Sequence, residues 1–133
     1  MRFLLDSDIC SANLKRPAGL MHRFVQHAGR LHIAGIALAE IYVWVYRRQN
    51  AARTVRRVED DLLADVAVLD FDAACAQEFG KVRAKLLRQG ISVPTTDLMI
   101  ASVALVHDLT LVTHNTNDYC NVPDPHVEDW LRP

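Results

Sequence analysis

Residues 4–8 read LLDSD, so an apolar run ends in two aspartates, Asp6 and Asp8, that a single serine separates. An apolar run that stops at polar residues is typical of a short buried strand. Two carboxylates near one strand end repel each other, so they need a cation or a proton donor between them. A simpler interpretation is that both aspartates cap and turn the segment that follows.

Short apolar runs alternate with longer helical patterns along the rest of the chain. The apolar runs are RFLLD, LHIAG, VAVLDF and LTLVT; the helical patterns are LMHRFVQHA and residues of about 36–49, 51–64, 72–89 and 95–107, before a terminal HVEDWL. Residues 41–46, IYVWVY, have strand propensity, but the run that contains them is too long for a typical strand and a helix is predicted. The alternation predicts an α/β fold, with a mostly parallel sheet covered by helices on both faces.

The composition is that of a globular protein, and we expect one domain over residues 1–133. Hydrophobic residues make up 50%, charged residues 23%, and the net charge of -1 does not by itself indicate a nucleic-acid or membrane partner. Without a signal peptide or a membrane-spanning run, the protein is expected to be cytoplasmic. Three cysteines without a C-x-x-C pair predict buried free thiols rather than disulfides or zinc ligands. No glycine-rich phosphate loop is present.

Three further acidic residues stand in unusual surroundings. Glu40 is the only charged residue from Leu31 to Tyr46, where burying an unpaired carboxylate is costly. Asp97 falls in the first turn of the predicted helix over 95–107, and Asp118 follows LTLVT in a polar loop. The simpler interpretations are a favourable helix dipole for the first two and turn formation for the third.

These acids are predicted to converge, because the carboxyl ends of parallel strands meet at one edge of a sheet. At about 6 Å and an effective dielectric near 20, each pair of like charges opposes folding by roughly 3 kcal/mol. A divalent cation reverses the sign of that interaction. Oxygen ligands of this kind favour Mg²⁺ or Mn²⁺.

Four segments of the chain together resemble one known family. They are LLDSDIC, ALAEIYV, PTTDLMIASVA, and LVTHNTNDYCNVP followed by VEDWL. In order, spacing and context they resemble the PIN-domain ribonucleases and, within these, the VapC-type toxins of type II toxin-antitoxin pairs. The resemblance covers nearly the full length. It implies a three-layer α/β/α sandwich with strand order 3-2-1-4-5.

The resemblance also implies a set of site residues. The catalytic acids would be Asp6, Glu40, Asp97 and Asp118; the metal, Mg²⁺ or Mn²⁺, would be held by Asp6, Asp97 and Asp118; and the substrate-positioning residues would be Ser7, Thr113 and Asn115. Glu40 would position water or a second ion. The chain departs from the family at Asp8, where an asparagine is common, and at Ala34 and Ala37, where many relatives have hydroxyls.

The implied function is that of a toxin that hydrolyses RNA phosphodiester bonds and leaves a 5′-phosphate and a 3′-hydroxyl. Its expected partners are the RNA substrate, a VapB-type antitoxin and a second copy of the chain, with no membrane. The antitoxin would place an arginine among the acids and a helix in an apolar groove near Tyr42–Tyr46. The homodimer is expected because IYVWVY and LMIASVALV exceed what one small core can cover.

Two sets of basic residues are predicted to contact the RNA, because acids alone repel a polyanion. One set comprises Arg47, Arg48, Arg53, Arg56 and Arg57, and the other comprises Lys81, Arg83, Lys85 and Arg88. Each set has the simpler interpretation of a solvated helix face.

Two other functions remain open at this point. A haloacid-dehalogenase-like phosphatase would use the Asp6 and Asp8 pair, although Cys10 stands where that family has threonine or valine. A non-catalytic PIN-like module would only bind RNA or a partner.

Overall fold

The computed structural model describes residues 1–15 and 18–132, and in these residues a five-stranded parallel sheet forms the centre of the molecule. Its strands are β1 (Phe3–Leu5), β2 (Leu31–Ala34), β3 (Ala67–Leu69), β4 (Thr110–Val112) and β5 (Val127–Glu128). They pair in the order β3-β2-β1-β4-β5, and each pairing is parallel. The predicted sheet and its strand order are confirmed.

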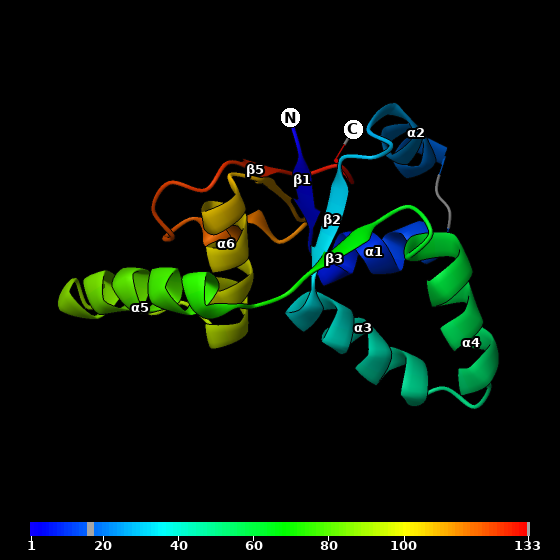
Figure 1. The fold of residues 1–133 in the computed structure, drawn as a ribbon, viewed down its shortest axis with the longest axis horizontal. Coiled ribbons are helices and arrows are strands. Elements are labelled where there is room, and N and C mark those ends of the chain that lie inside the picture. Colours follow the sequence, from blue (N-terminus) through cyan, green and yellow to red (C-terminus); the bar gives the residue numbers. More distant parts are fainter. Residues whose placement is uncertain (16–17, 133) are drawn as a thin grey trace.

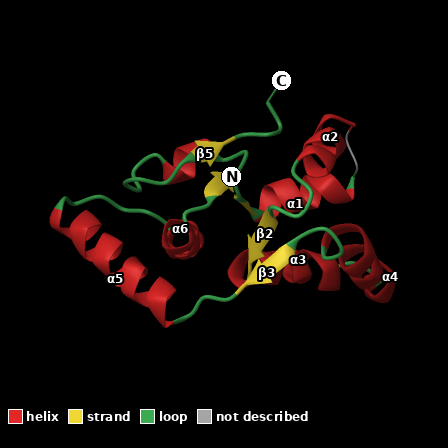
Figure 2. Cartoon of the chain, turned by 45° about the horizontal axis from the view of Figure 1, so that its top comes forward, coloured by secondary structure: helices red, strands yellow, loops and turns green. Residues whose placement is uncertain are grey.

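Helices cover both faces of this sheet. They are α1 (Ser7–Leu14), α2 (Ala18–Gln26), α3 (Gly35–Tyr46), α4 (Ala51–Arg57), α5 (Ala73–Arg88) and α6 (Thr95–His107). Figures 1 and 2 both show α5 and α6 on one side of the sheet and α1, α3 and α4 on the other. The predicted α/β/α sandwich is therefore confirmed. Among the described residues, no helix is long and apolar enough to cross a membrane.

The register of the sheet determines which polar groups meet at its carboxyl edge. Leu5 pairs with Val112, and the N–H of Asp6 donates to the carbonyl of Val112 at 2.9 Å. The residues that follow β1 and β4 are therefore neighbours, although 107 positions separate Asp6 from Thr113. Central strands such as β1 are buried on both faces, which explains why FLL is apolar throughout.

Several helices differ from the sequence prediction in their bounds. The stretch after β1 is a helix, α1, rather than a turn, and the aspartates at its start cap it. The charged helix expected over 51–64 divides into α4 and a π-helical turn, Val58–Leu62. Residues 41–46 are helical as predicted, within α3, and the start of that helix at Ala34 has no side-chain cap.

Two expectations about burial are wrong. Most of α6 lies in the chain's own core, where Leu98, Ile100 and Val103 are fully buried, so LMIASVALV exposes little apolar surface beyond Val106. Exposed apolar side chains lie on α3, at Val43 and Tyr46, and also on α2 and α5. Cys10 and Cys75 are buried free thiols, as predicted, but Cys120 is exposed.

Candidate active site

Asp6 occupies the carboxyl end of β1 and is only 6% exposed. One carboxylate oxygen, Oδ1, accepts the N–H of Ser7 at 2.8 Å, at the start of α1. The other, Oδ2, accepts the hydroxyls of Thr113 and Tyr119, each at 3.0 Å. Asp6 is thus the N-cap residue of α1 and also the centre of a hydrogen-bond network that joins the start of α1 to the segment after β4.

Asp8 connects the first turn of α1 to the loop after β4. Its Oδ1 accepts the N–H of Ile9 at 2.7 Å, and its Oδ2 accepts the N–H of His114 at 2.9 Å and the hydroxyl of Thr113 at 3.3 Å. The capping interpretation therefore holds for Asp8. Its second carboxylate oxygen positions the loop that carries Thr113, so Asp8 supports the geometry around Asp6.

Tyr119 is a member of the site that the sequence analysis missed. It ends the 3₁₀ turn Thr116–Tyr119, is 2% exposed, and its hydroxyl donates to Asp6. Burial, followed by the nearby charges of Asp6 and Asp97, raises the pKa of the phenol far above its ordinary value, so the group remains a proton donor. Its position next to Asp118 in the sequence was the available signal, but an aromatic residue there fits a core role equally well.

Asp97 lies in the first turn of α6 and faces the other acids. Its pKa is raised to about 6, first by burial and then by the charges of Asp118, Asp6 and Glu40, and hydrogen bonding to Tyr119 opposes this rise. Because the charges of Asp118, Asp6 and Glu40 all contribute to this shift, the four predicted acids lie within electrostatic range of one another.

Glu40 enters this cluster from α3, on the other face of the sheet from α6. It is exposed on one side, and partial burial followed by the charge of Asp6 raises its pKa, which the hydroxyl of Ser7 lowers. Burial and the charge of Asp8 likewise raise the pKa of Asp6. A cavity of ≈ 230 Å³ opens beside Glu40, and its wall is formed by Ser7, Asp8, Ser11, Lys15, Glu40, Ile41 and Trp44.

The polar loop residues differ in how closely they approach the acids. Thr113 is fully buried and shares its hydroxyl proton between Asp6 and Asp8. Asn115 is exposed and contributes through its backbone, because its N–H donates to the hydroxyl of Thr113 at 3.1 Å and its carbonyl accepts the N–H of Asp118. Asp118 is exposed at the rim. The structure thus brings Thr113 directly onto the acids and leaves the Asn115 side chain outside.

The chemistry of this cluster fits a hard divalent cation. Its donors are carboxylate and hydroxyl oxygens, and its acids raise one another's pKa, so a cation would relieve an unbalanced negative charge. Within residues 1–15 and 18–132, no three Asp, Glu, His or Cys side chains are already arranged to enclose a metal ion. Binding one would therefore require the less buried carboxylates of Asp97 and Asp118 to turn toward Asp6, which Thr113 and Tyr119 hold in place.

Comparison with known proteins agrees with this architecture. The family model of the PIN domain matches residues 3–124. The chain belongs to the PIN-domain family. Membership of the PIN family leaves the phosphatase alternative without support. In addition, the carboxylate of Asp8 accepts three hydrogen bonds, so it is not free to act as a general acid.

Individual PIN proteins match over almost their whole length. The chain is 35% identical to the tRNA(fMet)-specific endonuclease VapC of Shigella flexneri, covering 98% of both chains, and 30% identical to Ribonuclease VapC2 of Haemophilus influenzae, covering 98% and 99%. A chain of DNA-bound VapBC from Salmonella typhimurium superposes with a TM-score of 0.91 at 31% identity, over 98% of each chain. VapBC2 of Rickettsia felis, bound to promoter DNA, gives 0.89 at 28% identity.

Proposed function

We propose that the chain is the ribonuclease toxin of a toxin-antitoxin pair, and that it hydrolyses RNA phosphodiester bonds with the help of Mg²⁺ or Mn²⁺. The observation that carries this proposal is the cluster of Asp6, Glu40, Asp97 and Asp118 at one edge of a PIN fold, where each carboxylate comes from a different element. The relatives that match over their full length bear names of ribonucleases, which supports the same reaction.

Asp6, Asp97 and Asp118 are the residues that would hold the cation. When bound, a divalent cation polarises the phosphate and lowers the pKa of water, which provides a nucleophile near neutral pH. The raised pKa of Asp97, to which neighbouring negative charges contribute, supports its role as a ligand that a positive charge would stabilise. The same three carboxylates repel RNA until the cation is present.

The protein's own groups prepare the site for this reaction. Tyr119 and Thr113 hold Asp6 in one orientation through two hydroxyls, so its position costs little reorganisation when substrate arrives. Glu40, which lines the adjoining cavity together with Ser7, would accept a hydrogen bond from the attacking water and take its proton. Products with a 5′-phosphate and a 3′-hydroxyl follow from attack on phosphorus with departure of the 3′ oxygen.

A VapB-type antitoxin is proposed as the protein partner. An apolar cavity of ≈ 630 Å³ lies on α3 and α4 between Ala39, Tyr42, Val43, Tyr46, Val55 and Glu59. Val43 is 62% and Tyr46 66% exposed, which suits the apolar face of an amphipathic helix. An arginine from the same partner would form charge-assisted hydrogen bonds with the acids and exclude the cation. The similar proteins from Salmonella typhimurium and Rickettsia felis were crystallised as VapBC complexes.

A homodimer is proposed through the exposed part of α3, since α6 is covered by the chain itself. Light scattering of the isolated chain at micromolar concentration should give twice the mass of 15.0 kDa. A monomer under those conditions would remove the homodimer from the proposal and leave α3 to the antitoxin alone.

Cleavage of pooled RNA by the purified chain tests the central proposal. We expect products in Mn²⁺ or Mg²⁺, none in EDTA, and inhibition when the product of the neighbouring gene is added. A chain that binds RNA but never cleaves it would be the non-catalytic module. Persistent cleavage after rigorous metal removal would exclude the metal mechanism.

A further inference from the structure

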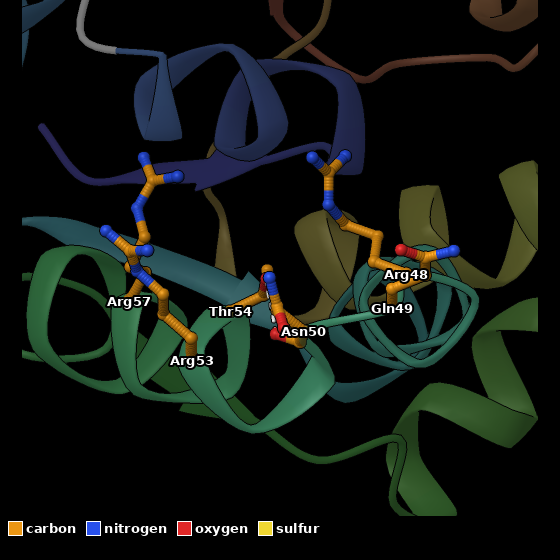
Figure 3. A pocket seen from close by; sticks show the side chains of 6 residues that line it. All are labelled: Arg48, Gln49, Asn50, Arg53, Thr54 and Arg57. Atoms are coloured by element: carbon orange, nitrogen blue, oxygen red, sulfur yellow. Dashed lines mark hydrogen bonds between the residues drawn. The ribbon is translucent and has the colours of Figure 1, made fainter.

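A third cavity, of ≈ 630 Å³, lies where α3 ends and α4 begins. Figure 3 shows the guanidinium groups of Arg48, Arg53 and Arg57 extending from this region toward α1. The remaining wall consists of Gln49, Asn50 and Thr54. The lining thus holds three arginines, three neutral polar residues and no acid. We call these six residues the arginine cavity.

One arginine of the cavity is part of the framework. The guanidinium of Arg57 donates to the carbonyl of Leu14, at the end of α1, and its Nε lies 3.8 Å from a carboxylate oxygen of Asp61. Thr54 donates to the carbonyl of Asn50 at 3.2 Å, which fixes the start of α4. These contacts define the floor of the cavity and connect it to α1.

The other two arginines keep their charges uncompensated. Across residues 1–15 and 18–132, neither Arg48 nor Arg53 forms an ion pair. Arg48 packs against the ring of Trp44, since its guanidinium carbon lies 4.7 Å from the ring centre. This contact positions the side chain without neutralising its charge. Both guanidiniums are therefore presented to an anion, and guanidinium groups match phosphate oxygens with paired hydrogen bonds.

The arginine cavity adjoins the acidic site through Trp44. This residue lines the cleft that contains Glu40 and Lys15, and its ring also contacts the guanidinium of Arg48. A single strand of RNA that extends from the acids along α3 would therefore contact an aromatic ring first and the arginines next. Stacking of a base on an aromatic side chain beside a cationic track is a common arrangement in single-stranded RNA binding.

The basic residues of α5 present a different picture. Arg83 donates to the carbonyl of Val93 at 2.9 Å and to the hydroxyl of Thr95 at 3.3 Å, so its charge is used to attach α5 to the segment before α6. Lys81, Lys85 and Arg88 lie exposed along the outer side of α5. Among the described residues, the set of α3 and α4 combines two unpaired guanidiniums, a cavity and a contact with a residue that lines the cleft of Glu40.

We propose that the arginine cavity binds the phosphate backbone of the RNA substrate, with Arg48 and Arg53 as the phosphate ligands and Trp44 as the stacking platform between cavity and acids. This inference rests on the proposed ribonuclease function and adds the direction in which the RNA leaves the site. An acidic segment of a protein partner is the competing occupant, and the experiment below separates the two.

Fluorescence anisotropy of labelled bulk tRNA, with the full chain in EDTA, measures binding without cleavage. The test variant is Arg48→Gln/Arg53→Gln, and the matched control is Lys81→Gln/Arg88→Gln, which removes the same charge from α5. We expect the test variant to weaken binding about tenfold or more and to reduce the slope of log K against log salt by about 1.5, the value for two lost phosphate contacts. The control should lose less than about threefold.

Because Arg48→Gln also removes the contact between Arg48 and Trp44, a second variant tests the loss of charge alone. The side chain of Arg53 forms no hydrogen bond or ion pair in the described part of the chain. The variant Arg53→Glu should therefore fold normally and weaken tRNA binding by a similar factor. Its melting temperature, compared with that of the unchanged protein, verifies folding. Equal binding by Arg53→Glu and the unchanged protein would overturn the inference.

Kinetics distinguish this inference from the proposed function itself. In Mn²⁺ the test variant should raise KM for pooled tRNA about tenfold and leave kcat within about twofold. If the unchanged protein cleaves tRNA but the test and control variants behave alike, the arginine cavity is not an RNA site and the ribonuclease proposal stands. If the test variant still binds tRNA but no longer binds the antitoxin, the arginine cavity binds a protein segment instead of RNA. If the unchanged protein cleaves no RNA, the proposed function fails first.

Discussion

The acidic site and the arginine cavity are assembled in opposite ways. The acidic site takes its residues from β1, α3, α6 and the turn after β4, and hydrogen bonds between buried side chains hold its centre together. The arginine cavity comes from one continuous stretch, residues 48–57, most of which is exposed. A change in the first should disturb geometry, whereas a change in the second should remove charge and little else.

Metal removal should separate the two regions most completely. In EDTA, RNA cleavage should disappear and should return when Mn²⁺ or Mg²⁺ is added, because only the acidic site is built from the oxygen ligands that these ions prefer. Anisotropy with labelled tRNA should detect binding throughout, since the arginine cavity needs no cation. Loss of tRNA binding together with cleavage would show that the two regions are not independent.

Asp97→Asn should reduce cleavage by about a thousandfold or more, because it removes a charge that the cation needs. Asp108→Asn is the matched control: Asp108 ends α6 in the left-handed region at φ 52°, where asparagine is well tolerated, and its carboxylate is exposed. Cleavage of pooled RNA over time measures both. Equal rates for Asp97→Asn and its control would contradict the assignment of Asp97, and Asp6→Asn and Glu40→Gln test the other acids in the same way.

Tyr119→Phe removes a single hydroxyl from the centre of the acidic site. Asp6 then loses a buried donor at 3.0 Å, so we expect a loss of about 1–2 kcal/mol of stability and about tenfold weaker cleavage. Tyr46→Phe, at an exposed position on α3, is the control. Thermal melting without metal and titration with Mn²⁺ provide readouts besides activity. A variant with unchanged melting temperature and unchanged Mn²⁺ affinity would reduce Tyr119 to a core residue.

The smallest predicted effect is a dependence of stability on pH in the absence of metal. The pKa of Asp97 is about 6 in the folded chain and 3.8 ordinarily, so between these values the native state binds more protons than the unfolded state. Stability must then fall as pH rises from about 4 to about 6. With a discount for solvent screening, the loss is about 1 kcal/mol, or a few degrees of melting temperature.

Asp97→Asn should flatten this part of the profile. In EDTA it should melt like the unchanged protein near pH 4 and slightly above it at pH 7, because asparagine carries no charge to repel Asp118 and Asp6. Scanning calorimetry at several pH values measures the difference. A variant that melts well below the unchanged protein at pH 7 would mean that Asp97 stabilises the metal-free fold rather than straining it.

The order of the strands and the four acids could be predicted because they depend on local pattern and on resemblance. Apolar runs that alternate with helical periodicity indicate parallel strands, and acids at strand ends and helix starts then share one edge. The bounds of α6 matched the prediction, since Pro94 and Thr95 mark its start and His107 and Asp108 its end. The helix α1 was missed because LLDSD looks like a strand followed by a turn, and its N-cap aspartates fit both interpretations.

The class of fold, the candidate acids and the two basic sets could thus be read from the sequence. The tertiary structure alone decided that Tyr119 and Thr113 meet Asp6, that α6 is covered, and that only one basic set surrounds a cavity beside Trp44. The reason is physical. Periodicity records whether a residue faces inward, but a hydrogen bond between Asp6 and Tyr119 depends on the register of β1 against β4, and free arginines differ from bound ones only through their neighbours in space.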